Sequence, residues 1–337
     1  GRGREGKDRT AEKNHGKIGA RQIKAESFPL KRKERRKDEM RTAYISIVGR
    51  ANVGKSTLLN AIIGEKISIV SNKPQTTRNR ITGIYNRDGM QLVFVDTPGM
   101  HTPKNKLGEH MVKAAKEAMD DVDAAILVVE CKPPRATEKR IIERLAADGT
   151  PTILVINKID CVKKADIMKT IEEYSKLGEF ASVIPISALK NDGVQIVLKE
   201  IMPFTNEDGV QYYPDDEDTD QTVRQMASEL VREKILRNMH DEIPHGIAVE
   251  PLVFKDRKNK NGEPLTDIVM NIICEKESHK GMLIGKAGSM LKKTASEARA
   301  DIEKLLGNKV NLQCYVKVKE NWRDSEKIIT ELALFDD

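Results

Sequence analysis

The fold follows from one stretch, Gly49-Arg50-Ala51-Asn52-Val53-Gly54-Lys55-Ser56-Thr57, which has the Gly-x-x-x-x-Gly-Lys-Ser spacing of a phosphate-binding loop. An apolar run over residues 43–48 precedes it and predicts a buried strand, and apolar residues at helical spacing predict a helix over 55–63. Such a loop points backbone N–H groups at an anion, beside the positive end of the helix dipole. The whole stretch is therefore predicted to bind nucleotide phosphate, with Lys55 on the β- and γ-phosphates and the Ser56 hydroxyl on Mg²⁺.

Length and composition predict a globular protein with two domains. The chain has 337 residues, of which 39% are hydrophobic, and this is long enough for two separate cores. Its four cysteines are scattered, without paired or metal-ligand spacing, which fits a reducing cytoplasm and predicts no metal cluster. No apolar run is long enough to cross a membrane.

The net charge of +6 is concentrated at the N-terminus. Residues 1–40 contain 14 Lys and Arg against 7 Asp and Glu, a net charge of +7, which leaves −1 for the remainder. Bulk charge alone therefore does not predict nucleic-acid binding by the folded part. The tail has no amphipathic period and is expected to be disordered. Three interpretations stay open: a basic RNA-binding arm, a solvated extension without a role, and a translated leader upstream of a start at Met40.

Two further motifs predict switch loops that sense the γ-phosphate. Residues 71–80 are polar, basic and interrupted by Pro74, and a threonine there, Thr76 or Thr77, is expected to close over the γ-phosphate and Mg²⁺. A predicted strand over 90–95 runs into Asp96-Thr97-Pro98-Gly99. Asp96 is placed to hold Mg²⁺, directly or through a water, and the Gly99 N–H to sense the γ-phosphate.

A guanine site is predicted after two later strands. The strand expected over 152–156 delivers Asn157-Lys158-Ile159-Asp160, in which Asp160 can accept both the ring N–H and the exocyclic amine of guanine. The Lys158 stem can lie along the base. A last strand over 182–186 leads into Ser187-Ala188-Leu189, whose backbone can support the base from the other side. These motifs narrow the prediction from a nucleotide hydrolase to a GTPase.

The catalytic centre lacks the glutamine that orients the attacking water in Ras-like enzymes. Met100 stands at that position, and its thioether cannot orient water in the same way, so intrinsic hydrolysis is expected to be slow. His101 is adjacent, and we interpret it as a surface or switch residue in preference to a base. Asn52 resembles the asparagine with which some bacterial GTPases hold K⁺ in place of an arginine finger, and K⁺ stimulation is kept as a hypothesis.

The second half predicts an RNA-binding domain. Residues 206–221 are acidic and polar without periodicity, which predicts a linker. The pattern then reads helix, strand, strand, helix, helix, strand, with Gly285-Lys286-Ala287-Gly288 between the last two helices. This is the order of a type II KH domain, in which the glycines let a nucleic-acid backbone pass close. The residues predicted to contact RNA are Lys280, Ile284, Gly285, Lys286, Ala287, Gly288, Lys292 and Lys293.

From about Met40 to its end, the chain resembles the Era-type GTPases, bacterial proteins with a C-terminal KH domain. The resemblance rests on Pro-Gln-Thr-Thr-Arg from Pro74, Asp-Thr-Pro-Gly-Met-His from Asp96, Asn-Lys-Ile-Asp from Asn157, Ser-Ala-Leu from Ser187, Ile-Pro-His-Gly-Ile-Ala-Val-Glu from Ile243 and Lys-Gly-Met-Leu-Ile-Gly-Lys-Ala-Gly from Lys280. Ala51 stands where the family usually has proline, and Ala287 where it often has glycine. Neither departure removes a ligand.

The resemblance implies a P-loop GTPase domain, with a mixed, mostly parallel sheet and helices on both faces, over 41–205, and a type II KH α+β domain over 222–333. It implies binding of GTP, GDP and Mg²⁺, and a GTP-dependent role in small ribosomal subunit assembly through the 3′ region of the small-subunit ribosomal RNA. GTP would order residues 71–80 and 97–108 and thereby change how the KH domain sits on the GTPase domain. We expect a cytoplasmic protein and keep peripheral association with the inner membrane face as an added hypothesis. The alternatives are a tRNA-directed GTPase and an RNA-binding module whose nucleotide site is structural.

Overall fold

The computed structural model describes residues 40–73, 75–87, 89–100, 103–239 and 246–332. The tail expected over 1–40 lies outside these ranges except for Met40, which begins the first strand and is therefore not part of a disordered segment. Pro74 and His101 also lie outside the described residues. No helix in the ranges given is long and apolar enough to cross a membrane.

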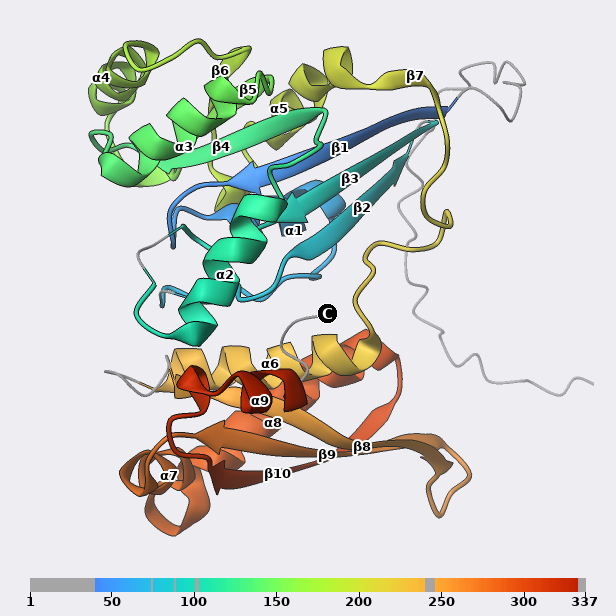
Figure 1. The fold of residues 1–337 in the computed structure, drawn as a ribbon. Coiled ribbons are helices and arrows are strands. Elements are labelled where there is room, and N and C mark those ends of the chain that lie inside the picture. The colour runs from blue at the N-terminus through green and yellow to red at the C-terminus, as the bar shows by residue number, and fades with distance from the viewer. Residues whose placement is uncertain (1–39, 74, 88, 101–102, 240–245, 333–337) are drawn as a thin grey trace, which may run out of the picture. The chain divides into compact units, whose positions relative to one another are not determined.

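The first half of the described chain is built on a seven-stranded sheet in the order β2-β3-β1-β4-β5-β6, with β7 paired to β1 (Figure 1). Strands β1, β3, β4, β5 and β6 run parallel, while β2 and β7 are antiparallel to their neighbours. The strands are β1 Met40–Val48, β2 Ile81–Arg87, β3 Met90–Asp96, β4 Ala124–Glu130, β5 Thr152–Asn157, β6 Ser182–Pro185 and β7 Asn206–Gly209. The central strands are buried on both faces, which explains their continuous apolar sequences.

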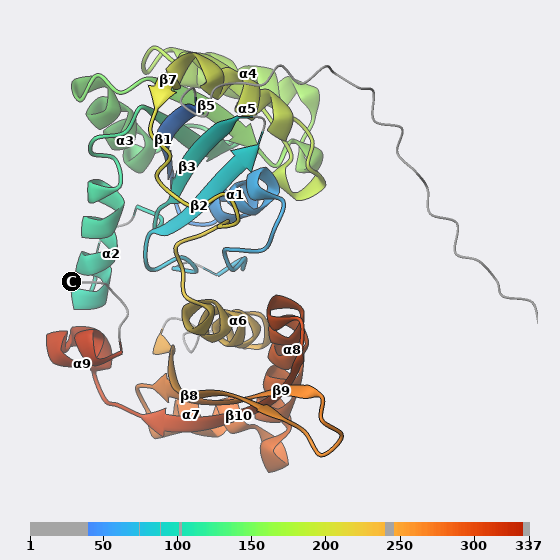
Figure 2. The ribbon, with the colours of Figure 1, turned by 90° about the vertical axis from the view of Figure 1, so that its right-hand side faces the viewer.

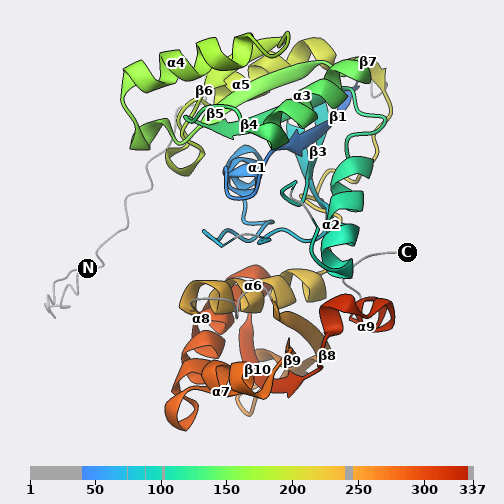
Figure 3. The same cartoon turned by 60° about the vertical axis from the view of Figure 1, so that its left-hand side comes forward.

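Helices cover both faces of this sheet. One apolar cluster joins the strands to α1 and α5, and another joins the opposite face to α3 and α4. Figure 3 shows α1 on one side of the sheet and α3 on the other. The helices are α1 Lys55–Ile63, α2 Lys106–Glu117, α3 Ala136–Ala147, α4 Lys164–Ser175 and α5 Val194–Ile201. The mixed sheet and its two helical layers confirm the predicted fold class.

The parallel strands place the predicted motifs at one edge of the sheet. Strands β1, β3, β5 and β6 each end immediately before or within one of the motifs, at Val48, Asp96, Asn157 and Pro185. In open α/β sheets, ligands bind outside the carboxyl ends of the strands, where the strand order reverses. Here β1 lies between β3 and β4, and the chain crosses from β3 on one side of β1 to β4 on the other, so the loop after β1 lies at such a point.

The stretch predicted as a linker, 206–221, is partly ordered against the first domain. Asn206–Gly209 forms β7, which pairs with the first residues of β1. The sequence did not indicate this strand because it is short and polar. Further on, the Gln91 side chain accepts the N–H groups of Tyr212 and Tyr213 at 2.7 and 3.0 Å. The segment is therefore held by backbone pairing, by hydrogen bonds and by a ring contact between Tyr212 and Tyr44. The domain limits themselves stay a prediction.

The second half has a three-stranded sheet in the order β10-β9-β8, with β9 parallel to β10 and antiparallel to β8. Its elements are α6 Val223–Asn238, β8 Ala248–Lys258, β9 Pro264–Cys274, α7 Glu277–Ile284, α8 Ser289–Leu306, β10 Lys309–Val318 and α9 Glu326–Glu331. Figure 2 shows α6 and α8 on the same face of this sheet, where their apolar residues and those of the strands form one core. The element order is the one that the sequence predicts for a type II KH domain.

Candidate nucleotide site and nucleic-acid groove

The phosphate-binding loop between β1 and α1 has backbone geometry that requires its two glycines. Gly49 and Gly54 have φ of 147° and 100°, and a Cβ on either would collide with a neighbour, the carbonyl of Val128 or the amide of Asn157. Lys55 is buried, and its Nζ donates to the carbonyls of Gly49 and Arg50 at 3.2 and 3.0 Å. Its ammonium group is thus already inside the loop.

Three side-chain oxygens from three different segments meet beside this lysine. The Ser56 Oγ lies 2.6 Å from the Asp96 Oδ2 and 2.8 Å from the Thr77 Oγ1, and the Thr77 Oγ1 lies 3.4 Å from the same carboxylate oxygen. The second carboxylate oxygen, Asp96 Oδ1, is buried and has no hydrogen-bond partner within the described part of the chain. Hard oxygen donors of this kind suit Mg²⁺. The residues present therefore fit a magnesium ion.

The structure separates the two candidate threonines of the first switch loop. The Thr76 hydroxyl donates to the carbonyl of Lys73 at 2.6 Å, so it is turned toward its own loop. The Thr77 hydroxyl instead reaches Ser56 and Asp96. Thr77 is thus the member of the pair that joins the oxygen cluster.

Burial shifts the two charged groups of this site in opposite directions. It lowers the pKa of Lys55 to about 8, against the opposing effect of Asp96. It raises the pKa of Asp96, although Lys55 and the hydroxyls of Ser56, Thr77 and Ser68 favour its ionised form. Both groups are therefore less stable as charges here than in water, and a phosphate or a cation at the site would favour their charged forms.

The second switch motif lies directly against the phosphate-binding loop. A Cβ on Gly99 would come within 2.6 Å of the Ala51 backbone, so only glycine allows this approach. The Met100 N–H reaches the Gly49 carbonyl at 3.4 Å. The Thr97 hydroxyl donates to the Ile47 carbonyl at 2.9 Å and, like Pro98, is buried. Of the predicted motif, Asp96 and Gly99 face the nucleotide site, while Thr97 braces β3 against β1.

The residues predicted to bind guanine have different environments, since Asp160 is exposed and Asn157 is buried. The Ser187 Oγ donates to the Asp160 Oδ1 at 2.7 Å, and this hydrogen bond lowers the pKa of Asp160. Asn157 is 2% exposed; its amide donates to the Val53 carbonyl at 2.9 Å and accepts the Ala188 N–H at 3.0 Å. Asn157 therefore connects the phosphate loop to the base site, and Asp160 is left facing solvent with its carboxylate oriented by Ser187.

The remaining predicted residues of the nucleotide site have distinct environments. The Lys158 Nζ donates to the Asn52 carbonyl at 2.5 Å and pairs with Glu130. The side chain of Asn52 donates to the Asn72 carbonyl at 2.9 Å, which links the phosphate loop to the first switch. Arg50 pairs with Glu138, Val53 packs in the core, Leu189 is exposed, and Thr57 lines the cavity. That cavity, between the loop and the first switch, has a volume of about 90 Å³.

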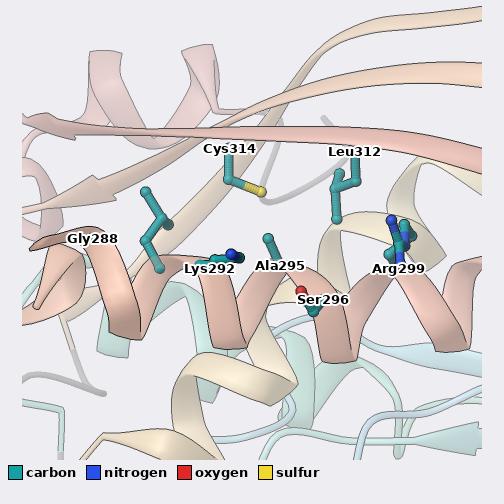
Figure 4. Close-up of a pocket in the computed structure, with 8 residues that line it drawn as sticks. Gly288, Lys292, Ala295, Ser296, Arg299, Leu312 and Cys314 are labelled. Carbon is teal, nitrogen blue, oxygen red and sulfur yellow. The ribbon is translucent and has the colours of Figure 1, made fainter.

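A second cavity, in the KH half, is a groove of about 330 Å³ between α8 and β10. Figure 4 shows Leu312 and Cys314 pointing from the strand toward the helix. The helix contributes Leu291, Lys292, Ala295, Ser296 and Arg299, and Gly288 lines the groove just before the helix begins. Burial raises the pKa of Cys314 to about 12, so its thiol is neutral and contributes an apolar surface to the groove. β10 is the edge strand of its sheet, so one side of its backbone has no neighbouring strand in the described part of the chain.

The Gly285–Gly288 segment forms a tight turn at one end of this groove. Gly285, Ala287 and Gly288 all have positive φ, at 72°, 49° and 77°, and α8 begins directly after them. Lys286, Lys292 and Arg299 make no ion pair with another described residue. Lys280 and Lys293, in contrast, pair with Glu277 and Glu297 at 3.6 and 3.9 Å. Of the eight predicted RNA residues, Gly288 and Lys292 line the groove itself.

Sequence reasoning missed most of the groove lining. Residues 291, 292, 295, 296 and 299 form one stripe at helical spacing on α8, and 312 and 314 alternate along β10. That periodicity was a usable signal, but the pairing of this stripe with β10 depends on the three-dimensional fold.

Comparison with known proteins finds matches to each half and to most of the chain. Residues 44–158 match a family described as 50S ribosome-binding GTPase, and residues 242–323 match a KH domain family. The chain is similar to GTPase Era of Ruminiclostridium cellulolyticum, 47% identical over 294 residues, with 87% of this chain and 97% of that protein covered. It is 51% identical over 295 residues to GTPase Era of Clostridium botulinum (strain Hall), with 87% and 98% covered. A crystal structure of Era in complex with MgGDPNP and nucleotides 1506–1542 of 16S ribosomal RNA matches with a TM-score of 0.83 and 35% identity, covering 88% of this chain and 99% of that one.

Proposed function

The chain belongs to the Era family of GTPases, and from that premise we propose that it is a GTP-controlled switch that binds the 3′ region of small-subunit ribosomal RNA and assists assembly of the small ribosomal subunit. The observation that carries the proposal is the meeting of Ser56, Thr77 and Asp96 beside Lys55, in a chain that also has an open KH groove. The Era structure solved with a magnesium-bound GTP analogue and 16S ribosomal RNA supports it.

The phosphate loop and the three oxygens would hold the triphosphate and its metal. The N–H groups of the loop and the buried Lys55 bind the β- and γ-phosphates, replacing the carbonyls that Lys55 contacts now. Ser56 and Thr77 would ligate Mg²⁺, and Asp96 would hold it directly or through a water. Bound there, Mg²⁺ neutralises the charge that develops on the phosphate oxygens. Gly99 senses the γ-phosphate because its backbone already lies against Ala51.

Asp160 would select guanine. Its carboxylate, oriented by Ser187, accepts two hydrogen bonds from the guanine edge, which adenine cannot donate. The Lys158 stem covers one side of the base, and the backbone of Ser187, Ala188 and Leu189 supports the other. Asn157 acts through its bonds to Val53 and Ala188, which keep the base site in register with the phosphate loop.

Intrinsic GTP hydrolysis at this site is slow in the absence of a stimulating group. Met100 follows Gly99 and offers no group that can orient the attacking water. Asn52 belongs to the phosphate loop, and its side chain donates a hydrogen bond to the Asn72 carbonyl of the first switch. A K⁺ ion coordinated by the Asn52 side-chain oxygen and carbonyls of that switch would supply positive charge near the phosphates. We propose K⁺ stimulation on that basis.

The KH groove would bind single-stranded RNA. Lys286, at the tight turn, and Lys292 and Arg299, on α8, contact the phosphate backbone, and the turn lets that backbone approach closely. The apolar floor of Leu312 and Cys314 receives bases, and the edge of β10 offers hydrogen-bonding groups to their Watson–Crick edges. Lys280, Ile284 and Lys293 flank this site. A cytoplasmic location and a peripheral membrane contact stay predictions.

One preparation of the full chain tests both activities. We expect hydrolysis of GTP but not ATP in the presence of Mg²⁺. We also expect tight binding of a single-stranded oligonucleotide matching the 3′ region of the small-subunit RNA, with much weaker binding of a scrambled oligonucleotide. Equal affinity for the two sequences would refute the RNA assignment. Binding of the matched sequence without any GTP turnover would favour an RNA-binding module with a structural nucleotide site.

A further inference from the structure

One arginine of the KH half is buried against the first switch loop of the GTPase half. Arg232, on α6, is 1% exposed. Its guanidinium donates to the carbonyl of Thr76 and, at 3.5 Å, to that of Gln75. Glu229, one turn earlier on the same helix, accepts from its Nε at 2.7 Å and pairs with its Nη2. The guanidinium is thus oriented by its own helix and directed at the backbone of the switch.

The contacted carbonyls immediately precede Thr77. The Thr77 hydroxyl is one of the three oxygens of the predicted Mg²⁺ site, 2.8 Å from the Ser56 Oγ. Thr76 and Thr77 share a peptide unit, and peptide units are planar and rigid. Moving the Thr76 carbonyl therefore moves the Thr77 backbone with it. Arg232 therefore contacts the peptide that carries Thr77, and it can act on the predicted Mg²⁺ site through this peptide.

We propose that Arg232 is a positioning residue for GTP hydrolysis, supplied by the KH half, that holds the first switch loop with Thr77 directed at the Mg²⁺ site. The inference rests on the proposed function, because it assumes that Thr77 ligates the metal of a GTP-hydrolysing site. It goes beyond that function by assigning part of the hydrolytic geometry to a residue outside the GTPase motifs.

The burial of Arg232 makes the contact specific. A guanidinium removed from water must have its donors paired, since leaving a buried charge unpaired is strongly unfavourable. Here its acceptors are Glu229 and the two switch carbonyls, so withdrawal of the switch would leave donors unsatisfied unless α6 also moved. The position of the switch and the position of α6 are therefore coupled.

A second contact holds the entrance of the same loop. Glu233, the next residue of α6, is fully buried and accepts the N–H of Val70 at 3.0 Å. Lys66 donates to its other carboxylate oxygen at 2.7 Å. The first switch is thus contacted by consecutive residues of α6, at Val70 and again at Gln75 and Thr76. Glu233 thus holds the entrance of the loop, and Arg232 contacts the peptide that carries Thr77.

The test compares the full chain with Arg232→Met, Arg232→Lys and the matched control Arg224→Met. Arg224 lies on the same helix, is exposed, and has its guanidinium over Phe254 within the KH half. For each variant, the GTP hydrolysis rate is measured as a function of Mg²⁺ concentration, together with GDP affinity and affinity for the matched RNA oligonucleotide. Thermal unfolding identifies any variant that fails to fold.

For Arg232→Met we expect kcat to fall about tenfold or more and the half-saturating Mg²⁺ concentration to rise by a similar factor. GDP affinity should stay within about twofold, because the Thr77 contact belongs to the triphosphate state. Arg232→Lys should recover part of the loss, since its ammonium group keeps the positive charge and can still donate to a switch carbonyl. Arg224→Met should match the wild type.

Unchanged kcat and Mg²⁺ dependence in a folded Arg232→Met protein would overturn the inference. So would a parallel loss of GDP affinity, which would indicate a general structural role. If Arg232→Met does not fold, the same readouts on Arg232→Lys decide between these outcomes. Failure of the wild type to hydrolyse GTP would instead refute the proposed function, so the two failures are distinguishable.

Discussion

The nucleotide site and the RNA groove hold their positive charges in opposite ways. Lys55 is buried and bonded to two loop carbonyls, and Arg232, which contacts the adjacent switch, is buried and paired with Glu229. Lys292 and Arg299 in the groove, and Lys286 in the turn at its end, have no ion-pair partner among the described residues. A ligand must therefore replace internal contacts at the first site, whereas it meets unpaired cations at the second.

This difference predicts different kinds of recognition. Replacing buried contacts demands an exact geometric match, because any group left unpaired is costly, and this favours discrimination between similar nucleotides. Unpaired exposed cations attract phosphate at long range with little discrimination, and the affinity that they supply falls with salt. Sequence preference in the groove must then come from its floor and from the edge of β10.

Asp160→Asn should have the largest effect on this comparison. The carboxylate accepts two guanine donors, and an amide cannot accept both, so the preference for GTP over ATP should fall by about 10⁴-fold. The measurement is the ratio of kcat/KM for the two nucleotides. Asp148→Asn, at the exposed end of α3, is the control and should leave the ratio unchanged. An unchanged ratio in Asp160→Asn would place guanine selection elsewhere.

Glu233→Gln should have an intermediate effect, on stability and its dependence on pH. Burial alone would raise the pKa of Glu233, but hydrogen bonds from Lys66 and the Val70 N–H hold it below its ordinary value of 4.5. Its contribution to stability is therefore fully present above pH 4.5 and is lost as the pH falls through the folded-state pKa. Replacing the buried carboxylate by a neutral amide should lower the free energy of unfolding by about 3 kcal/mol near neutral pH.

Urea unfolding at pH 7 and at several pH values below 4.5 measures this effect. The difference between wild type and Glu233→Gln should shrink as the pH falls. Glu172→Gln removes an exposed carboxylate that is also paired with a lysine, Lys176, and should change neither stability nor its pH dependence measurably. A constant difference at all pH values would show that the ionised form of Glu233 is not what stabilises the contact.

Lys292→Gln should have the smallest effect. Lys292 lines the groove without an ion pair, so its loss should weaken oligonucleotide binding severalfold and lower the slope of log affinity against log salt by about 0.7. Lys304→Gln, on the same helix but paired with Asp301, should leave the slope unchanged. A slope that falls equally in both variants would mean that net charge, and not the groove, attracts the RNA.

Sequence patterns are sufficient to predict a structural element where neighbouring residues determine its limits. The helix over Lys55–Ile63 was predicted with its observed limits, because Gly54 before it and Gly64 after it are both in the left-handed region and mark its ends. The helix Ser289–Leu306 follows the same rule, between Gly288 and Gly307. The order of the KH elements was likewise readable from the changes in hydrophobic period.

Other features depend on contacts between distant parts of the chain. Thr76 and Thr77 are equivalent as sequence, and only the position of Ser56 and Asp96 distinguishes them. Arg232 is an ordinary helical arginine by pattern, and its role follows from burial against residues more than 150 positions earlier. Asn206–Gly209 is polar and short, so its pairing with β1 leaves no periodic signal.

The central claim, that nucleotide state controls RNA binding, is tested most directly by one affinity comparison. The full chain is titrated with the matched single-stranded oligonucleotide, with saturating Mg²⁺ and either GDP or a non-hydrolysable GTP analogue, at one fixed salt concentration. We predict about tenfold tighter binding with the analogue, within the usual range of coupling between two sites. Equal affinities in the two states would contradict the claim, and would leave the nucleotide site and the RNA groove as independent functions of one chain.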